Sequence, residues 1–298
     1  MHWIISSILG AFFQNTRSSI QKKLNKEMSL MASTYTRFVF SAPIVIVVFF
    51  FNFKNVDIIF ISANNFQFLS YVILGSIFQI LFTFLFLYLF KFTNFLVGTT
   101  LSKTEVLQIA LFEYLILKEY LSTWVIIGII ISSIGVIIFS TTNIKNIFRN
   151  FFSKSTIIGI FCGTLLALSI VFFRGSINLL DAENTNFDKT LIAILFSTIF
   201  QTLIITLYLL LYEKNQFLII KKNIGLSFLS GLSGFLATIF WFYSFSIVQA
   251  AFVRAVGQIE LLFSYLSSRF LFKEKIKFFE IMGILIFITG VFLIIFYK

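Results

Sequence analysis

Long apolar runs, each about the length of a membrane-spanning helix, alternate with short polar breaks along the whole chain. About 20 mostly apolar residues in a helix cross the ~30 Å hydrocarbon core of a bilayer. We predict a helix for each run between clusters of charged, Asn or Asp residues: 3–21, 29–51, 66–90, 93–117, 121–140, 155–178, 189–212, 225–246, 249–271 and 279–296. The pattern therefore predicts an all-α integral membrane protein with ten transmembrane helices.

The composition agrees with lipid as the solvent of this chain. Hydrophobic residues make up 59% of the sequence and charged residues only 12%, whereas soluble domains carry about 25% charged residues. The single cysteine, Cys162, excludes a disulfide within the chain. With one histidine, His2, the chain has too few ligands for a zinc or haem site. We therefore predict no metal and no cofactor.

The net charge of +11 is distributed in short basic clusters between the apolar runs, which favours anionic lipid head groups and not a nucleic acid as the partner. The odd-numbered loops hold most of these residues: Lys22, Lys23, Lys26, Lys91, Lys145, Arg149, Lys154, Lys214, Lys221, Lys222, Lys273, Lys275 and Lys277. The even-numbered loops hold only Lys54, Lys118 and Lys189. The positive-inside rule then predicts that both termini lie outside the cytoplasm.

The two halves of the chain repeat one pattern. Shifting the second half back by 155 positions aligns rare residues without a gap: Glu105 with Glu260, Glu119 with Glu274, Gly128 with Gly283, Gly135 with Gly290, and Tyr88 with Tyr243. We predict two five-helix repeats, residues 1–150 and 151–298. Five crossings are an odd number, so the second copy must enter the membrane from the opposite side. Such inverted repeats are an architecture of secondary transporters, with the site near the midplane between the halves.

Two glutamates are the leading candidates for a site. Glu105 and Glu260 lie near the middle of the fourth and ninth predicted spans, where an ionisable side chain costs about 2.5–3.5 kcal/mol and usually faces a partner or a wet cavity. Each could bind a proton, a cation or a substrate amine, or could simply hold two helices together. The other candidates for substrate or proton binding are nearby cations and polar or aromatic residues: Arg37, Lys103, Arg254, Gln258, Tyr88, Tyr243 and Trp241.

Other polar residues are assigned structural roles. Arg17 and Arg174 lie toward the ends of the first and sixth spans, where we expect their side chains to reach the interface. Charged residues at span ends are expected to cap or anchor helices: Glu119, Glu274, Arg269 and Glu280. Because the chain has a single proline, helix breaks would have to arise at glycine or Ser/Thr. The candidates are Gly98-Thr99-Thr100, Gly231 and Gly234, where the small residues could instead permit close helix contact.

Signatures of enzymes are absent from the sequence. The chain has no G-x-G-x-x-G, no phosphate-binding loop, no G-x-S-x-G and no histidine placed to activate a nucleophile. An intramembrane aspartyl enzyme needs a pair of aspartates within its spans, whereas Asp57, Asp181 and Asp188 all lie in or beside loops. We therefore predict no catalytic residues and no enzymatic activity.

The segment Val256-Gly257-Gln258-Ile259-Glu260, followed by Leu271-Phe272-Lys273-Glu274, resembles the EamA-type drug/metabolite transporters. Its counterpart is Thr104-Glu105 followed by Leu117-Lys118-Glu119, with the same fourteen-residue spacing between the glutamates, and Arg37 is similar to an arginine of the family's second helix. The proline that often follows the central glutamate is replaced by Val106 and Leu261, so these positions lack the residue that would kink the helix.

This resemblance covers the whole chain and implies a ten-helix secondary transporter of the bacterial inner membrane. Family substrates are amino acids, nucleotide-related compounds, other small metabolites and sometimes drugs, and export is common. The family also implies cytoplasmic termini, opposite to the charge count.

We accordingly predict a secondary transporter, an exporter or exchanger, of a small polar or amphipathic metabolite such as an amino acid. Protons are one option for the coupling ion. A monomer contains both repeats and is sufficient, and a homodimer is compatible with the sequence. Two other functions stay open at this stage: a non-transporting membrane scaffold or subunit, and a passive facilitator.

Overall fold

The computed structural model describes residues 2–53, 57–91, 102, 105–140, 154–180, 185–270 and 279–297, and every regular element of three or more residues in these ranges is a helix. The helices are α1 (His2–Leu24), α2 (Leu30–Val39), α3 (Ser41–Asn52), α4 (Asp57–Asn64), α5 (Phe66–Leu89), α7 (Glu105–Phe112), the π-helix η2 (Glu113–Leu117), α8 (Thr123–Ser140), α10 (Lys154–Asn178), α11 (Asn186–Tyr212), α12 (Gln216–Lys222), α13 (Ile224–Ile247), α14 (Ala250–Gly257), α15 (Glu260–Phe270) and α16 (Phe279–Phe296).

Five stretches of the described chain are helical, long and apolar enough to cross a membrane. They are Leu30–Asn52, Phe66–Leu89, Ile157–Asn178, Asn186–Tyr212 and Ile224–Ile247. Two further apolar helices, Thr123–Gly135 and Leu285–Phe296, are shorter. Each of these seven segments overlaps a predicted span to within a few residues, which confirms a helical membrane protein, while the full count of ten stays a prediction.

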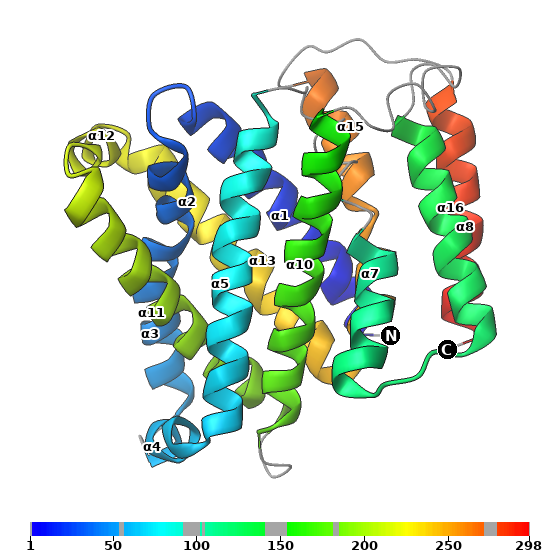
Figure 1. Ribbon diagram of the computed structural model, residues 1–298, viewed down its shortest axis with the longest axis horizontal. Coiled ribbons are helices and arrows are strands. Elements are labelled where there is room, and N and C mark those ends of the chain that lie inside the picture. The colour runs from blue at the N-terminus through cyan, green and yellow to red at the C-terminus, as the bar shows by residue number, and fades with distance from the viewer. Residues whose placement is uncertain are drawn as a thin grey trace.

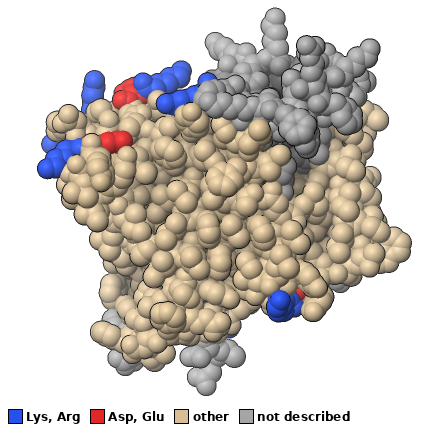
Figure 2. Space-filling view, viewed as in Figure 1, with Lys and Arg blue, Asp and Glu red and all other residues tan. Residues whose placement is uncertain are grey.

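The lateral surface of the molecule is apolar. Figure 2 shows a broad belt without charged side chains, with Lys and Arg gathered mainly at one end. Large apolar side chains point outward along this belt, and Phe51, for example, is 88% exposed. Water would penalise such a surface, whereas hydrocarbon does not, so the belt is the lipid-facing face.

Helices of the first half pack along helices of the second half. The most extensive packing joins α1 to α13, α5 to α10 and α8 to α16 (Figure 1). Under the 155-residue shift, α1 corresponds to α10 and α5 to α13, so the first two contacts exchange when the halves are exchanged. This packing fits a two-repeat layout in which the halves interlock.

The contact between α8 and α16 depends on the glycines that the repeat pattern aligned. A Cβ atom on Gly135 would clash with the backbone of α16 at Gly283 and Phe287, and one on Gly290 would clash with α8 at Gly128 and Ser132. These close approaches leave no room for a side chain, so the two helices touch backbone to backbone.

The second predicted span is interrupted at Phe40, between α2 and α3. Pro43 explains the break, because its ring lacks an N–H and would clash with the carbonyl of Val39 four residues earlier. The Ser41 hydroxyl lies within hydrogen-bond distance of two carbonyls, 2.5 Å from that of Arg37 and 2.8 Å from that of Gly231. The interruption therefore lies within one turn of Arg37 and is stabilised by a hydrogen bond to α13.

The ninth span is also interrupted, although it contains no proline. Helix α14 ends at Gly257 and α15 begins at Glu260, with Gln258 and Ile259 in a turn between them. Gly231 and Gly234 were wrong as predicted breaks, because both lie inside the continuous helix α13. A Cβ on Gly231 would meet Phe40, so this glycine permits the close approach of α2. Gly98-Thr99-Thr100 lies outside the described residues.

Candidate functional site

An ion pair lies in the interior between the two halves. The guanidinium of Arg254 on α14 donates to the carboxylate of Glu105 on α7, with a distance of 3.0 Å from Nε and a closer contact from Nη2. The side chains are 2% and 0% exposed. The arginine also lies over the ring of Trp241, 4.3 Å from its centroid, an arrangement in which the ring attracts the cation.

Trp241 connects this ion pair to the second glutamate. Its Nε1–H donates to the Gln14 side-chain oxygen at 3.0 Å, and Nε2 of Gln14 donates to Glu260 at 2.8 Å. A continuous polar chain thus runs from Glu105 through Arg254, Trp241 and Gln14 to Glu260. It joins both aligned glutamates through helices of both halves.

Two glycines allow the Trp241 ring to occupy this position. A Cβ on Gly10 would lie 3.0 Å from the ring, and one on Gly257 would clash with its far edge. Gly257 is also where α14 ends, so one residue serves both the helix interruption and the packing of the tryptophan.

Arg37 lines a small interior cavity together with Arg254, Trp241 and Gln14, and it is 5% exposed. Its Nη1 donates to the Thr83 hydroxyl at 3.1 Å, and Thr83 in turn donates to the backbone carbonyl of Gln79 at 2.8 Å. The Gln79 side-chain oxygen accepts a bond of 2.8 Å from Gln201 on α11. Within the described part of the chain, no carboxylate lies within 4 Å of Arg37.

The cavity between these residues is small. Its polar lining consists of Gln14, Arg37, Gln79, Thr238 and Arg254 together with the Trp241 indole, and its apolar lining of Phe82, Leu166, Ile170, Phe173, Phe242 and Phe245. The space open to the centre of a water molecule is about 20 Å³, which is enough for about one water. The structure is therefore closed around this point.

A wider crevice lies between α1 and α15. Its volume is about 290 Å³, and its wall includes Asn15, Lys23 and Ser267. Asn15 donates to the Ser264 hydroxyl at 2.7 Å and accepts from Ser267 at 2.7 Å. Asn15 neighbours Gln14 in the sequence, so the crevice extends from the polar chain toward Lys23 at the basic end of α1.

The structure brings together some of the predicted candidates and leaves others apart. Gln258 is buried in the turn before Glu260, and neither polar atom of its amide has a hydrogen-bond partner among the described residues. Tyr88 lies near the end of α5, where Lys91 Nζ is 5.9 Å from its ring centroid. Neither Tyr88 nor Tyr243 lines the interior cavity. Lys103 lies outside the described residues.

Gln14 and Asn15 were missed by the sequence argument, which considered charged and aromatic residues. The signal that could have found Gln14 is the helical spacing of polar residues in the first span, where Ser7, Gln14, Ser18 and Gln21 follow one another at intervals of seven, four and three residues. All four are buried. A polar stripe inside an apolar span indicates a face turned toward other polar groups.

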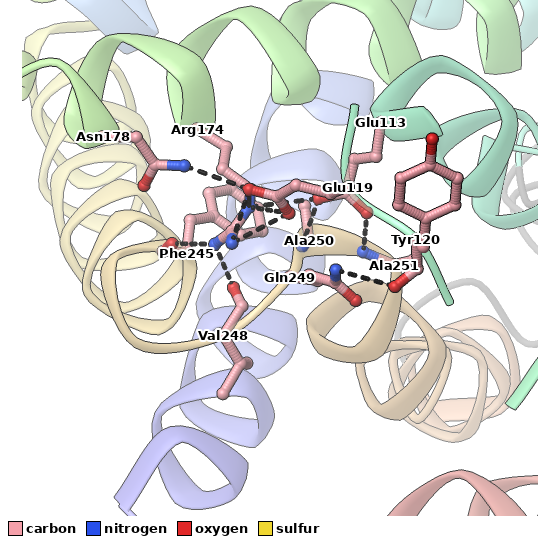
Figure 3. Close-up of polar contacts among 10 residues, drawn as sticks. All are labelled: Glu113, Glu119, Tyr120, Arg174, Asn178, Phe245, Val248, Gln249, Ala250 and Ala251. Atoms are coloured by element: carbon pink, nitrogen blue, oxygen red, sulfur yellow. Dashed lines mark hydrogen bonds and ion pairs between the residues drawn. The ribbon is translucent and has the colours of Figure 1, made fainter. Parts of the chain in front are cut away.

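A second polar cluster, which we call the Arg174 cluster, closes the interior at the end of α10 (Figure 3). Arg174 pairs with Glu119 at 2.9 Å and with Glu113 at 3.2 Å. It also donates to the carbonyls of Phe245 and Val248 at the end of α13. The expected roles were wrong: Arg174 does not reach the interface as a free cation, and Glu119 is its partner and not a solvated anchor. Arg17, which was also expected to reach the interface, is 2% exposed and lies in the interior.

Glu113 completes the Arg174 cluster and was also missed. Its two oxygens accept bonds of 2.6 and 3.0 Å from the backbone amides of Ala250 and Ala251, in the first turn of α14. Carboxylates are favoured at such a helix start. Figure 3 shows the cluster tying η2 and the following segment to α10, α13 and α14. Two residues of the cavity wall connect it to the cluster. Phe245 accepts a hydrogen bond from Arg174 through its carbonyl, and Phe173 precedes Arg174 in the sequence.

In the described part of the chain, no group of three or more His, Cys, Asp or Glu side chains is placed to hold a metal ion. The interior offers charge pairs and hydrogen bonds, which can bind, orient and neutralise a polar ligand.

Comparisons with known proteins identify the protein family that this chain matches. A family model described as the EamA-like transporter family matches residues 1–141 and 153–296. No curated protein matches the chain. One solved crystal structure superposes with a TM-score of 0.72 at 11% sequence identity, covering 99% of this chain and 97% of its own. At that identity the likeness concerns the fold alone.

Proposed function

The chain belongs to the EamA-like transporter family, and we propose that it is a secondary transporter of a small polar or amphipathic metabolite, such as an amino acid or a related compound. In this proposal ten helices cross the bacterial inner membrane as two inverted repeats, residues 1–150 and 151–298. The substrate binds between the repeats, at the polar chain from Glu105 to Glu260, and leaves by export or exchange.

The polar chain is the single observation that carries the proposal. Glu105 and Glu260 are both buried, both aligned by the repeat, and connected through Arg254, Trp241 and Gln14. Buried ion pairs are expensive to form and contribute little net stability. A transport site would explain why these buried charges are retained, because each must be able to exchange its partner for a substrate or a proton.

The closed geometry supports alternating access. The interior cavity has room for about one water, whereas small-molecule sites usually measure about 300–1,000 Å³. The Arg174 cluster seals one end of it with ion pairs and backbone hydrogen bonds that can form and break. A substrate could reach the site only when one end opens, which is the behaviour of a transporter and not of a permanent pore.

The proposal is tested by counterflow into proteoliposomes that contain the purified protein. The vesicles are preloaded with one unlabelled compound from a panel of amino acids, organic acids and amines, and uptake of the labelled compound is followed. We expect a transient overshoot for at least one compound. Glu105→Gln and Glu260→Gln should each reduce it to the level of protein-free vesicles.

The control is Glu27→Gln, because Glu27 is exposed near the end of α1 and its replacement should leave the overshoot intact. An overshoot that survives both interior substitutions would contradict the proposed site. Flux without overshoot would indicate a passive facilitator. Absence of flux, with the substitutions lowering only the melting temperature, would indicate a scaffold or subunit.

A further inference from the structure

The buried charges in the interior do not balance. Three arginines, Arg17, Arg37 and Arg254, face two glutamates, Glu105 and Glu260, and each of these five residues is at most 5% exposed. A buried charge without a counter-charge is strongly disfavoured. Outside the Arg174 cluster, the described interior of this transporter thus carries one more positive charge than negative charge.

The contacts assign the excess to Arg37. Arg254 pairs with Glu105, and Arg17 is within electrostatic range of Glu260. Arg37 interacts instead with the neutral Thr83 hydroxyl and with the ring of Phe38, and in the described part of the chain no carboxylate lies within 4 Å of it. Its own position is fixed, because Gly234 of α13 lies against its side chain.

The cavity beside Arg37 has a polar end and an apolar body. Its apolar wall is formed by aromatic and aliphatic side chains: Phe82, Leu166, Ile170, Phe173, Phe242 and Phe245. Arg37 and Arg254 stand at the same cavity, so a ligand in this place would meet two guanidinium groups and a largely apolar surface. The geometry suits a negatively charged head attached to an apolar body.

We propose that the substrate is an amphipathic monocarboxylate whose carboxylate pairs with Arg37 while its apolar body packs against the aromatic wall. The proposal rests on the transporter function proposed above and specifies its substrate class. A guanidinium binds a carboxylate through two parallel hydrogen bonds. One negative charge cancels the one excess positive charge, whereas an amine would be repelled by Arg37 and a dianion would exceed the balance.

The test is a thermal-shift series on the detergent-purified protein with four probes that share a phenyl ring: phenylacetate, phenylalanine, phenylethylamine and phenyl phosphate. We expect phenylacetate at millimolar concentration to raise the melting temperature the most and phenylethylamine not to raise it. Arg37→Gln should abolish the shift, and Lys222→Gln, which removes an exposed cation, should preserve it.

A second comparison needs no ligand. Without probe, Arg37→Gln should leave the melting temperature unchanged or raise it, because it removes a buried charge that lacks a counter-charge. Arg254→Gln should lower it, because it leaves Glu105 without this partner. A loss of stability in Arg37→Gln as large as in Arg254→Gln would overturn the assignment of the excess charge.

Three results in the probe series would overturn the substrate class: no shift with phenylacetate, an equal or larger shift with phenylethylamine or phenyl phosphate, or a shift that survives Arg37→Gln. These failures are distinct from failure of the transporter proposal. Counterflow of a cationic or uncharged compound that depends on Glu105 and Glu260 would retain the transporter and reject the monocarboxylate. Phenylacetate binding through Arg37 without counterflow would retain the monocarboxylate site and reject the transporter proposal.

Discussion

At the residue scale, the Arg174 cluster shows how a buried cation in an apolar fold obtains carboxylate and carbonyl partners. Arg174 is shared between Glu113 and Glu119, and the Glu113 side chain is 1% exposed. Removal of one partner from a buried pair leaves the other charge uncompensated. This typically costs about 3–5 kcal/mol.

We therefore predict that Arg174→Gln lowers the free energy of unfolding by about 3–5 kcal/mol. Glu113→Gln should also destabilise the protein, and the double variant should lose less than the sum of the two, with a coupling energy of about 1–3 kcal/mol. Unfolding in mixed micelles titrated with SDS measures all three values. Lys118→Gln, an exposed cation close to the cluster, serves as the control, and strictly additive losses would contradict the pairing.

The sequence pointed to some residues of the interior and could not point to others. Glu105, Glu260, Arg37 and Arg254 stand out because a charge in an apolar span is rare, and the structure places all four in the interior. Uncharged Gln14 carries no such signal until the helical spacing of its polar neighbours is considered. Which partner Arg254 takes could not be predicted, because that depends on how α7 and α14 lie in three dimensions.

At the element scale, hydropathy located the helices but not their interruptions. The π-helix η2 ends at Leu117, where the fourth predicted span ends. Periodicity cannot detect a two-residue turn such as Gln258–Ile259, since the apolar pattern continues through it. The break at Phe40 was predictable from Pro43, three residues later, by the steric effect of proline on the preceding turn.

The α8–α16 contact gives a prediction that belongs to this scale. Gly290→Ala would place a Cβ against the α8 backbone at Gly128 and Ser132, so we expect a loss of about 1–3 kcal/mol in the free energy of unfolding. Gly225→Ala is the matched control, since its Cβ would meet nothing within 4 Å and alanine favours a helix by up to about 1 kcal/mol. Equal effects of the two substitutions on SDS-induced unfolding would contradict the close packing.

At the scale of the whole molecule, charge is distributed unevenly between the two ends. The ends of α1, α5 and α11 lie with α12 at one end of the molecule (Figure 1), and the lysines in or beside them are Lys22, Lys23, Lys26, Lys91, Lys214, Lys221 and Lys222. At the opposite end, Lys118 follows η2 and Lys189 lies in the first turn of α11. Figure 1 places both marked chain ends at the second, lysine-poor end. The positive-inside rule places the lysine-rich end in the cytoplasm.

This orientation is tested with two exposed asparagines near opposite ends of α11. On a Cys162→Ala background, Asn186→Cys should react with a membrane-impermeant maleimide in intact spheroplasts. Asn215→Cys should react only after permeabilisation. The opposite labelling pattern would reverse the orientation and agree with the cytoplasmic termini that family resemblance implies.

The central claim is that the interior opens to one side at a time, and cysteine accessibility at the cavity measures this most directly. Thr238 lines the cavity, and in Thr238→Cys on the Cys162→Ala background we predict labelling by an impermeant maleimide from one side of the membrane at most. Adding Glu119→Gln, which weakens the Arg174 cluster, should shift labelling toward the end closed by that cluster. Labelling from both sides at once, or from the same side to the same extent with and without Glu119→Gln, would contradict alternating access.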